Sequence, residues 1–277
     1  MSRTSVLLAA ATFTTGCAFD YTVEESTEQY SFEAPIHALH VDVESGGIEV
    51  IGTEHSCASV EEVTRFSRTA PRVEVFAEDG VLHVRSRCPN QRACSTDFLI
   101  GVPHIALVQA EIGSGGVRVA HIDEDMEILT GSGAIEVSDS AGILDLETGS
   151  GAIVVEQAAG ALYAYTGSGA IDIMSFYGQM EVETGSGGIL GSDIEAWAIE
   201  AVTGSGAVEF WVDGPIEDLD VETGSGEVDL HVPAGEYRLR LHTGAGSVNV
   251  EDVQDQSGAD GSIRVETGSG HIWVTGE

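Results

Sequence analysis

The phrase Thr-Gly-Ser-Gly, followed by a small residue and an aliphatic one, recurs along most of this chain of 277 residues. From Gly113 to Gly185 the first glycines of successive copies are 18 residues apart, and later spacings are 19, 20, 20 and 24. Full copies begin at Thr130, Thr148, Thr166, Thr184, Thr203, Thr223 and Thr267, the copy at Thr243 has Ala245 in place of serine, and looser relatives begin at Ile112 and Glu44. A period near 20 residues indicates units that are too small to fold alone and that stack on their neighbours.

Each unit holds two short segments in which aliphatic and mostly acidic residues alternate, such as Leu144 and Leu146 before the glycines and Ile153 and Val155 after them. Alternation with a period of two places the aliphatic residues on one face of a strand, and no window has helical periodicity. Like residues recur at like positions, which favours parallel stacking of equivalent strands over an antiparallel meander closed by glycine hairpins. The predicted fold class is therefore all-β, a repetitive, parallel β-helix-like solenoid with coils of about 18–20 residues.

Composition shifts along the chain predict four segments. Residues 1–16 are expected to be a signal peptide of the lipoprotein type, and residues 17–31 a polar, acidic tether. Residues 32–110 read as an irregular β N-terminal module or cap, and residues 111–277 as the regular solenoid repeats.

The first residues favour export. Arg3 precedes a short apolar run that ends in Thr14-Thr15-Gly16-Cys17, and this run is too short to span a bilayer. The last four residues resemble a bacterial lipobox, although the family pattern prefers leucine where Thr14 stands, and the resemblance implies lipidation of Cys17. Ala18 rather than Asp after the cysteine implies the outer membrane of a Gram-negative bacterium. The alternative is an ordinary signal peptide with an incidental cysteine.

Three further cysteines are compatible with an exported, oxidising environment. Cys88 and Cys94 flank the short segment PNQRA and are the first candidates for a disulfide. A bridge from Cys57 to either of them is the alternative, since connectivity does not follow from sequence alone. No Cys or His spacing supports a zinc site.

The formal net charge is −35, and all eleven basic residues are arginine. The absence of lysine excludes Schiff-base and P-loop chemistry, and the acidity argues against nucleic-acid binding and favours cations or basic partners. Six arginines fall within residues 32–110, where they form either a patch for anionic envelope polymers or lipid headgroups, or local ion pairs with nearby acidic residues. These arginines are Arg65, Arg68, Arg72, Arg85, Arg87 and Arg92.

The glycine phrase is not expected to bind phosphate, because no helix follows it. Known calcium-binding repeats place an aspartate in the glycine loop, whereas Glu136 and its equivalents fall on a strand. We therefore predict no metal site, with calcium as the weaker alternative to a solvated acidic face. No nucleophile elbow, H-E-x-x-H or catalytic cysteine arrangement appears, so no catalytic residue is assigned.

The alternating V-x-V…SGxIxV units, the Val102-Pro103 step before the array and the export signal resemble the adhesin-like β-strand-repeat domain of bacterial envelope proteins, a domain of unknown function. The related head domain of proposed autotransporter adhesins is similar. The resemblance covers about residues 36–277. It implies a β-solenoid at the cell envelope, associated in some members with adhesion and in others with envelope-stress sensing, and it carries over no catalytic residues.

The favoured hypothesis is a non-enzymatic envelope lipoprotein that presents an acidic β-solenoid for adhesion or scaffolding. The alternative is a sensory or regulatory envelope protein that binds a cationic ligand, and the third is a calcium-dependent, polysaccharide-active β-helix enzyme. The final sequence HIWVTGE places Ile272, Trp273 and Val274 at an exposed edge of the stack. There Trp273 is expected to contact a partner or a second copy end to end, or else to cover the last core layer.

Overall fold

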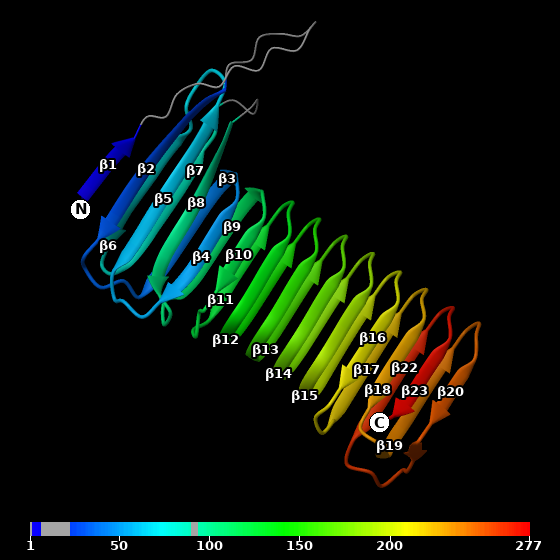
Figure 1. The fold of residues 1–277 in the computed structure, drawn as a ribbon. Coiled ribbons are helices and arrows are strands. Elements are labelled where there is room, and N and C mark those ends of the chain that lie inside the picture. Colours follow the sequence, from blue (N-terminus) through cyan, green and yellow to red (C-terminus); the bar gives the residue numbers. More distant parts are fainter. Residues whose placement is uncertain (1, 7–22, 90–93) are drawn as a thin grey trace, which may run out of the picture. The chain divides into compact units, whose positions relative to one another are not determined.

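The structure, a computed structural model, describes residues 2–6, 23–89 and 94–277, and these residues form strands, turns and bends without a helix (Figure 1). Within that part of the chain, no helix has the length and hydropathy needed to cross a membrane. The chain divides into two compact units, Met1–Gly133 and Ala134–Glu277. Both contain coils of parallel strands stacked on one another, and the first unit adds antiparallel strands, so the predicted all-β solenoid is confirmed.

The described part of the first unit contains eleven strands. They are β1 (Ser2–Val6), β2 (Glu24–Phe32), β3 (Ala38–Ser45), β4 (Ile48–Thr53), β5 (Ala58–Phe66), β6 (Arg72–Glu78), β7 (Val81–Arg87), β8 (Cys94–Pro103), β9 (Leu107–Ser114), β10 (Val117–Ala120) and β11 (Met126–Thr130).

Three coils of this unit stack out of sequence order. Strand β3 pairs in parallel with both β7 and β9, and β4 pairs in parallel with both β8 and β10. The coil at residues 38–53, which comes first in the sequence, therefore lies between the coils at 81–103 and 107–120. The looser glycine phrase at Glu44 is thus a stacked corner of the same kind as the others, because Gly46 N–H donates to Ser114 C=O at 3.0 Å.

Antiparallel strands cover the outer side of the coil at residues 81–103. Strand β5 pairs with β8, β2 pairs with β5, and β1 pairs with β2. Strand β6 pairs with β7 on the other strand layer of the coil. Strand β2 begins at Glu24, so the later part of the range expected as a tether, residues 17–31, belongs to a strand.

The second unit contains twelve strands. They are β12 (Ile135–Thr148), β13 (Ile153–Thr166), β14 (Ile171–Thr184), β15 (Ile189–Thr203), β16 (Val208–Val212), β17 (Asp218–Thr223), β18 (Val228–Val232), β19 (Gly235–Thr243), β20 (Val248–Glu251), β21 (Val253–Asp255), β22 (Ser262–Thr267) and β23 (Ile272–Gly276).

Strands β12 to β15 each pass through both layers of a coil. In β12 the chain turns between layers near Asp139, whose φ is 48°, and it turns again at the glycine corner after Thr148. Leu144 pairs with Leu162, one coil of 18 residues later, and both side chains are fully buried. The aliphatic columns therefore form the core between the layers, and the acidic columns point outward.

The first lengthening of the repeat has a local cause. Between β14 and β15, Gly178 pairs with Ala196 but Gln179 pairs with Ala198, so Trp197 has no partner in the register. One extra residue of this kind is a β-bulge. It converts the spacing of 18 residues into 19 without disturbing the core columns on either side.

The last coil in the sequence is not the last coil in space. Strand β22 pairs with β17 on one side and β19 on the other, and β23 lies between β18 and β20 (Figure 1). The prediction that Ile272, Trp273 and Val274 lie at an exposed edge is therefore wrong. Sequence order misplaced them, because the chain inserts its final coil between two coils that are already neighbours in the sequence.

The glycine corners bring backbones closer than any side chain would allow. A Cβ added to Gly187, whose φ is 150°, would lie 2.0 Å from the carbonyl oxygen of Gly169 in the preceding coil. Gly187 N–H donates to Ser205 C=O of the following coil at 3.0 Å. Only glycine tolerates both this φ and this approach.

The threonine before each corner bonds to the backbone rather than to another hydroxyl. The Thr184 hydroxyl donates to Gly169 C=O at 2.9 Å, and the Thr184 residue is 1% exposed. Thr166 makes the same bond to Gly151 at 2.9 Å. Each corner is therefore held to the preceding coil by a buried side-chain bond as well as by the backbone.

We expect Gly187→Ala to destabilise the second unit by about 2–5 kcal/mol. The added methyl group would collide with the Gly169 carbonyl oxygen, and alanine is strained at a φ of 150°. Urea denaturation measures this change. Gly258→Ala is the matched control, since a Cβ there meets nothing within 4 Å. Equal unfolding midpoints for the two variants would contradict the role assigned to the corners.

Candidate functional site

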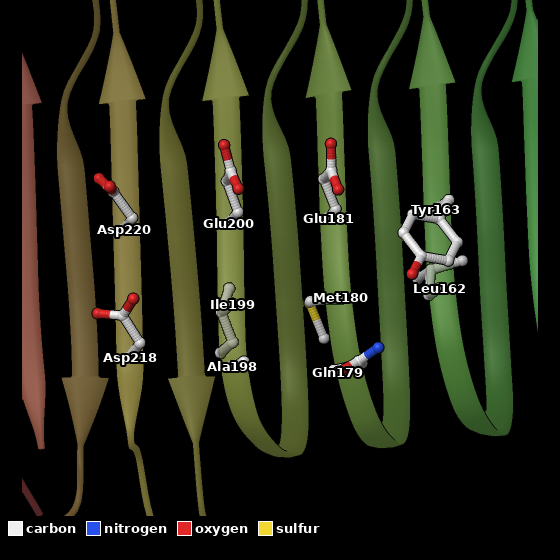
Figure 2. A pocket seen from close by; sticks show the side chains of 10 residues that line it. All are labelled: Leu162, Tyr163, Gln179, Met180, Glu181, Ala198, Ile199, Glu200, Asp218 and Asp220. Carbon is white, nitrogen blue, oxygen red and sulfur yellow. The ribbon is translucent and has the colours of Figure 1, made fainter.

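A row of carboxylates crosses adjacent strands on the outer face of the second unit. Glu181 on β14, Glu200 on β15 and Asp220 on β17 occupy the same register position (Figure 2). We call these three residues the carboxylate row. Tyr163 on β13 continues the row at one end, and Arg264 on β22 continues it at the other.

The carboxylate row lines a shallow groove of about 250 Å³. The groove is also lined by the residues two positions earlier on the same strands, which are Gln179, Ala198 and Asp218 (Figure 2). Adjacent strands are about 4.8 Å apart, so neighbouring carboxylates repel one another by roughly 1 kcal/mol or less in water. The regular stacking of the coils thus forces like charges together on this face.

Burial raises the pKa of Glu200 above its usual value, and the charges of Glu181 and Asp220 raise it further. One oxygen of Asp220, Oδ2, accepts a hydrogen bond from Arg264 at 2.8 Å. Its other oxygen, Oδ1, is buried without a hydrogen-bond partner among the described residues. The groove therefore holds acceptors in excess of donors, which suits a cationic or donor-rich ligand.

Exposed aromatic side chains lie beside the carboxylate row. Tyr163 is 40% exposed, and Tyr165, on the same face of β13, is 43% exposed. Tyr177 contacts Trp197 edge to face with ring centroids 5.9 Å apart. Aromatic faces next to carboxylates bind ammonium and guanidinium groups through cation–π contacts.

Within the described ranges, no group of three or more His, Cys, Asp or Glu side chains is arranged to hold a metal ion. The carboxylate row was not singled out by the sequence. Glu200, its central member, stands four residues before Gly204, just as Glu181 stands four residues before Gly185, so the repeat aligns the two. The alternation of Glu200 with the core residues Ile199 and Ala201 could have placed it on the outer face.

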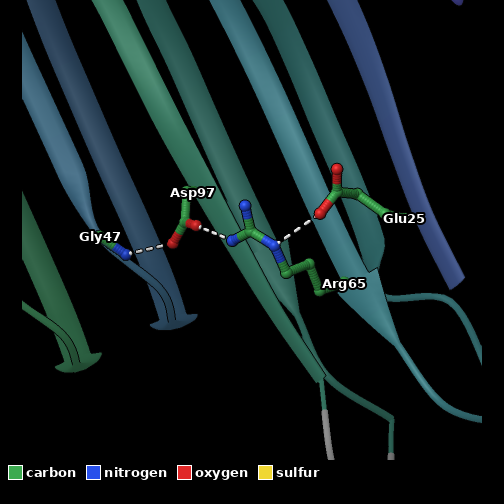
Figure 3. A network of polar contacts seen from close by, with 4 residues as sticks. All are labelled: Glu25, Gly47, Arg65 and Asp97. Atoms are coloured by element: carbon green, nitrogen blue, oxygen red, sulfur yellow. Dashed lines mark hydrogen bonds and ion pairs between the residues drawn. The ribbon is translucent and has the colours of Figure 1, made fainter. Parts of the chain in front are cut away.

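Several arginines of the first unit are committed to ion pairs. Arg65 Nε bonds to Glu25 at 2.8 Å, and the same guanidinium pairs with Asp97, which accepts from Gly47 N–H at 2.8 Å (Figure 3). This network ties β2, β5 and β8 to the corner before β4. Arg87 pairs with Asp42 in the same way. Local pairing, one of the two alternatives for these arginines, thus describes Arg65, Arg72 and Arg87. Arg72 pairs with the nearby Glu74 at 2.7 Å, whereas the partners of Arg65 and Arg87 are distant in the sequence.

The remaining sequence-predicted residues lie apart from the carboxylate row. Cys88 and Cys94 form a disulfide with Cα atoms 5.9 Å apart, and Cys57 is a free, exposed cysteine. Trp273 lies between Asp229 and Asn249 in the register, on the face formed by the strands that follow the corners. Cys17 lies outside the described residues.

The family model described as Toastrack DUF4097 matches residues 33–275. No curated protein matches the sequence significantly. The crystal structure of a proposed adhesin from Parabacteroides distasonis is 14% identical with a TM-score of 0.51, covering 90% of this chain and 97% of that one. A proposed cell adhesion protein from Clostridium sporogenes is 11% identical with a TM-score of 0.34, covering 92% of this chain and 100% of that one. At such identities the likeness concerns the fold alone.

The raised pKa of Glu200 makes its charge unfavourable in the folded state. Glu200 therefore stabilises the fold only while it is protonated, and this stabilisation is lost as the pH rises from the ordinary glutamate pKa of 4.5 through the raised pKa of the folded state. Glu200→Gln should therefore raise the melting temperature at pH 7 and low salt by about 1–2 °C, and less at pH 4 or in high salt.

Glu156→Gln is the control for this measurement, because it removes an equal charge whose register neighbours are Ser138 and Met174. Identical shifts of the melting temperature for both variants would show that net charge, and not the carboxylate row, is responsible.

Proposed function

Because the chain belongs to the Toastrack DUF4097 family, we propose that it is a non-enzymatic lipoprotein of the bacterial envelope that presents an acidic β-solenoid for adhesion or scaffolding. The observation that carries this proposal is the carboxylate row with exposed tyrosines beside it. Its side chains project from parallel strands whose corners are fixed by backbone contacts. A rigid, periodic surface of one charge sign is suited to a partner with repeated positive charges.

Periodicity is what distinguishes this surface from an ordinary acidic patch. Within the carboxylate row the acids repeat at about the strand spacing of 4.8 Å. In the next outward row Glu183 and Glu222 stand two strands apart, with Val202 between them. A polymer or protein surface with repeated cationic groups would engage several coils at once. Its avidity would then exceed the affinity of any single contact.

Anchoring belongs to the same proposal. Acylation of Cys17 would tether the solenoid to the envelope, with the outer membrane of a Gram-negative bacterium as the proposed location. Cys17→Ser is expected to release the full-length protein from the membrane fraction in cells. Unchanged retention of that variant would contradict the lipid anchor while leaving the acidic face untouched.

A second candidate function is sensing of a single cationic ligand in the groove. The buried Asp220 Oδ1, which lacks a hydrogen-bond partner among the described residues, favours it. A bound ammonium or guanidinium group would supply the missing donor. The two functions differ in how binding depends on the surface, because an adhesive face spreads its contacts over many carboxylates and a ligand site concentrates them.

We expect the purified protein to bind an immobilised octa-arginine peptide at low salt and to release it as ionic strength rises. Glu181→Gln combined with Glu200→Gln should weaken binding by about tenfold, through the loss of two charge-assisted contacts. Glu156→Gln combined with Glu236→Gln removes the same charge elsewhere and serves as the control.

Equal loss in the two double variants would mean that net charge alone attracts the peptide, and the proposed face would be wrong. Adding Glu183→Gln separates the two functions. A further graded loss supports an adhesive face, whereas no further loss supports a single ligand site in the groove.

A further inference from the structure

The coil formed by β19 and β20, here called the end coil, exposes aliphatic side chains that other coils bury. Val248 is 40% exposed and Val250 is 38% exposed, and Leu239 and Leu241 are half-buried. The corresponding residues of the coil at 218–232 are fully buried. They are Leu219, Val221, Val228 and Leu230. The end coil therefore has core residues with a neighbour on one side only.

Backbone groups are open along the same edge. Arg238 N–H donates to Gly261 C=O at 2.9 Å, toward β22. Successive residues of a strand direct their backbone groups to opposite sides, so those of Leu239 and Leu241 face away from β22. Strand β21 covers only Gly235–Tyr237 on that side, and Leu239 N–H is bonded to the Asp255 carboxylate at 3.1 Å. Among the residues that the structure describes, no strand pairs with this edge of β19 beyond Leu239.

Two outward positions of β19, Arg238 and Arg240, carry the opposite charge to the matching positions of β17, Asp218 and Asp220. Ser262 on β22 pairs with Asp218 on one side and with Arg238 on the other. In the next row Arg264 pairs with Asp220 and with Arg240. Arg264 is already bonded to three carboxylates, those of Asp220, Glu222 and Glu266. Among the described residues, Arg240 makes no ion pair and faces the positive charge of Arg264.

The sequence identifies the chemistry that β19 would accept. If the coils stacked in sequence order, β19 would pair with β17, because 20 residues separate the corners at Gly224 and Gly244. Arg238 would then lie beside Asp218, and Arg240 beside Asp220. The inserted strand β22 prevents this pairing. Strand β19 is thus complementary in both aliphatic pattern and charge to a strand of the type Asp218–Thr223, and it has no such neighbour.

We propose that the open edge of the end coil docks an extended segment of a partner protein in which aliphatic and acidic residues alternate. The segment would add a parallel strand to β19, cover Leu239 and Leu241, and place a carboxylate beside Arg240. A two-fold dimer of this chain through the same edge would instead oppose Arg240 to the arginines of the copy. This edge lies two strands beyond Asp220, in the same register row as the carboxylates, and it selects the opposite charge.

The probe is a peptide with the sequence of Ile216–Val232, which carries Asp218, Asp220 and Glu222. Added to the isotope-labelled full chain, it should bind saturably, shift the amide signals of Leu241 and Val250, and protect them from hydrogen exchange. This measurement needs no variant of the protein. A peptide with arginine in place of Asp218, Asp220 and Glu222 should not bind.

Arg240→Glu should weaken binding of the acidic peptide at least about tenfold and allow the arginine peptide to bind. Arg72→Glu makes the same charge change in the first unit and should bind the acidic peptide as the native chain does. The proposal is overturned if both peptides bind equally, if the acidic peptide leaves the Leu241 signal unchanged, or if the native chain instead forms dimers through the end coil.

Discussion

The close approach of backbones at the glycine corners is the constraint on which the rest of the structure depends. At Gly169 and Gly187 the space for a side chain is taken by a carbonyl oxygen of the preceding coil. Hydrogen bonds from corner glycines to the next coil and from buried threonines to the preceding one fix the register. Once the register is fixed, a strand period of two places every aliphatic column inside and every acidic column outside. The carboxylate row is therefore a consequence of core stacking. Burial and the neighbouring carboxylates in the row raise the pKa of Glu200.

Insertion of a terminal coil between two others occurs in each unit. In the first unit the coil at 38–53 lies between its neighbours, and in the second unit the coil containing β22 and β23 does so. A coil with neighbours on both sides buries both of its strand edges, and chain termini otherwise tend to fray. In the second unit the exposed edge therefore belongs to the end coil. There Arg238 and Arg240 occupy positions that are acidic in β17.

The core of the fold could be predicted from the sequence, because repeated pairs such as Leu144 and Leu146 leave only one face to bury. The order of coils could not. Asp218 and Asp220 would match Arg238 and Arg240 in a sequential stack, so local pattern favours an arrangement that the chain does not adopt. Trp273 was misplaced for this reason, because the order of coils depends on contacts that a linear pattern does not contain. Glu200 was overlooked although the sequence aligns it with Glu181, since each stands four residues before the first glycine of a corner.

Native-state hydrogen exchange at the corner amides tests the central claim most directly. The N–H groups of Gly169 and Gly187 lie in surface turns, where amides usually exchange quickly, yet here they donate to Ser186 and Ser205 of the next coil. If the corners hold the stack together, these amides exchange only through opening of the coils, about as slowly as those of the core strands. If they exchange as freely as the amide of Gly258 while the strands stay protected, the corners are ordinary loops and the account is contradicted.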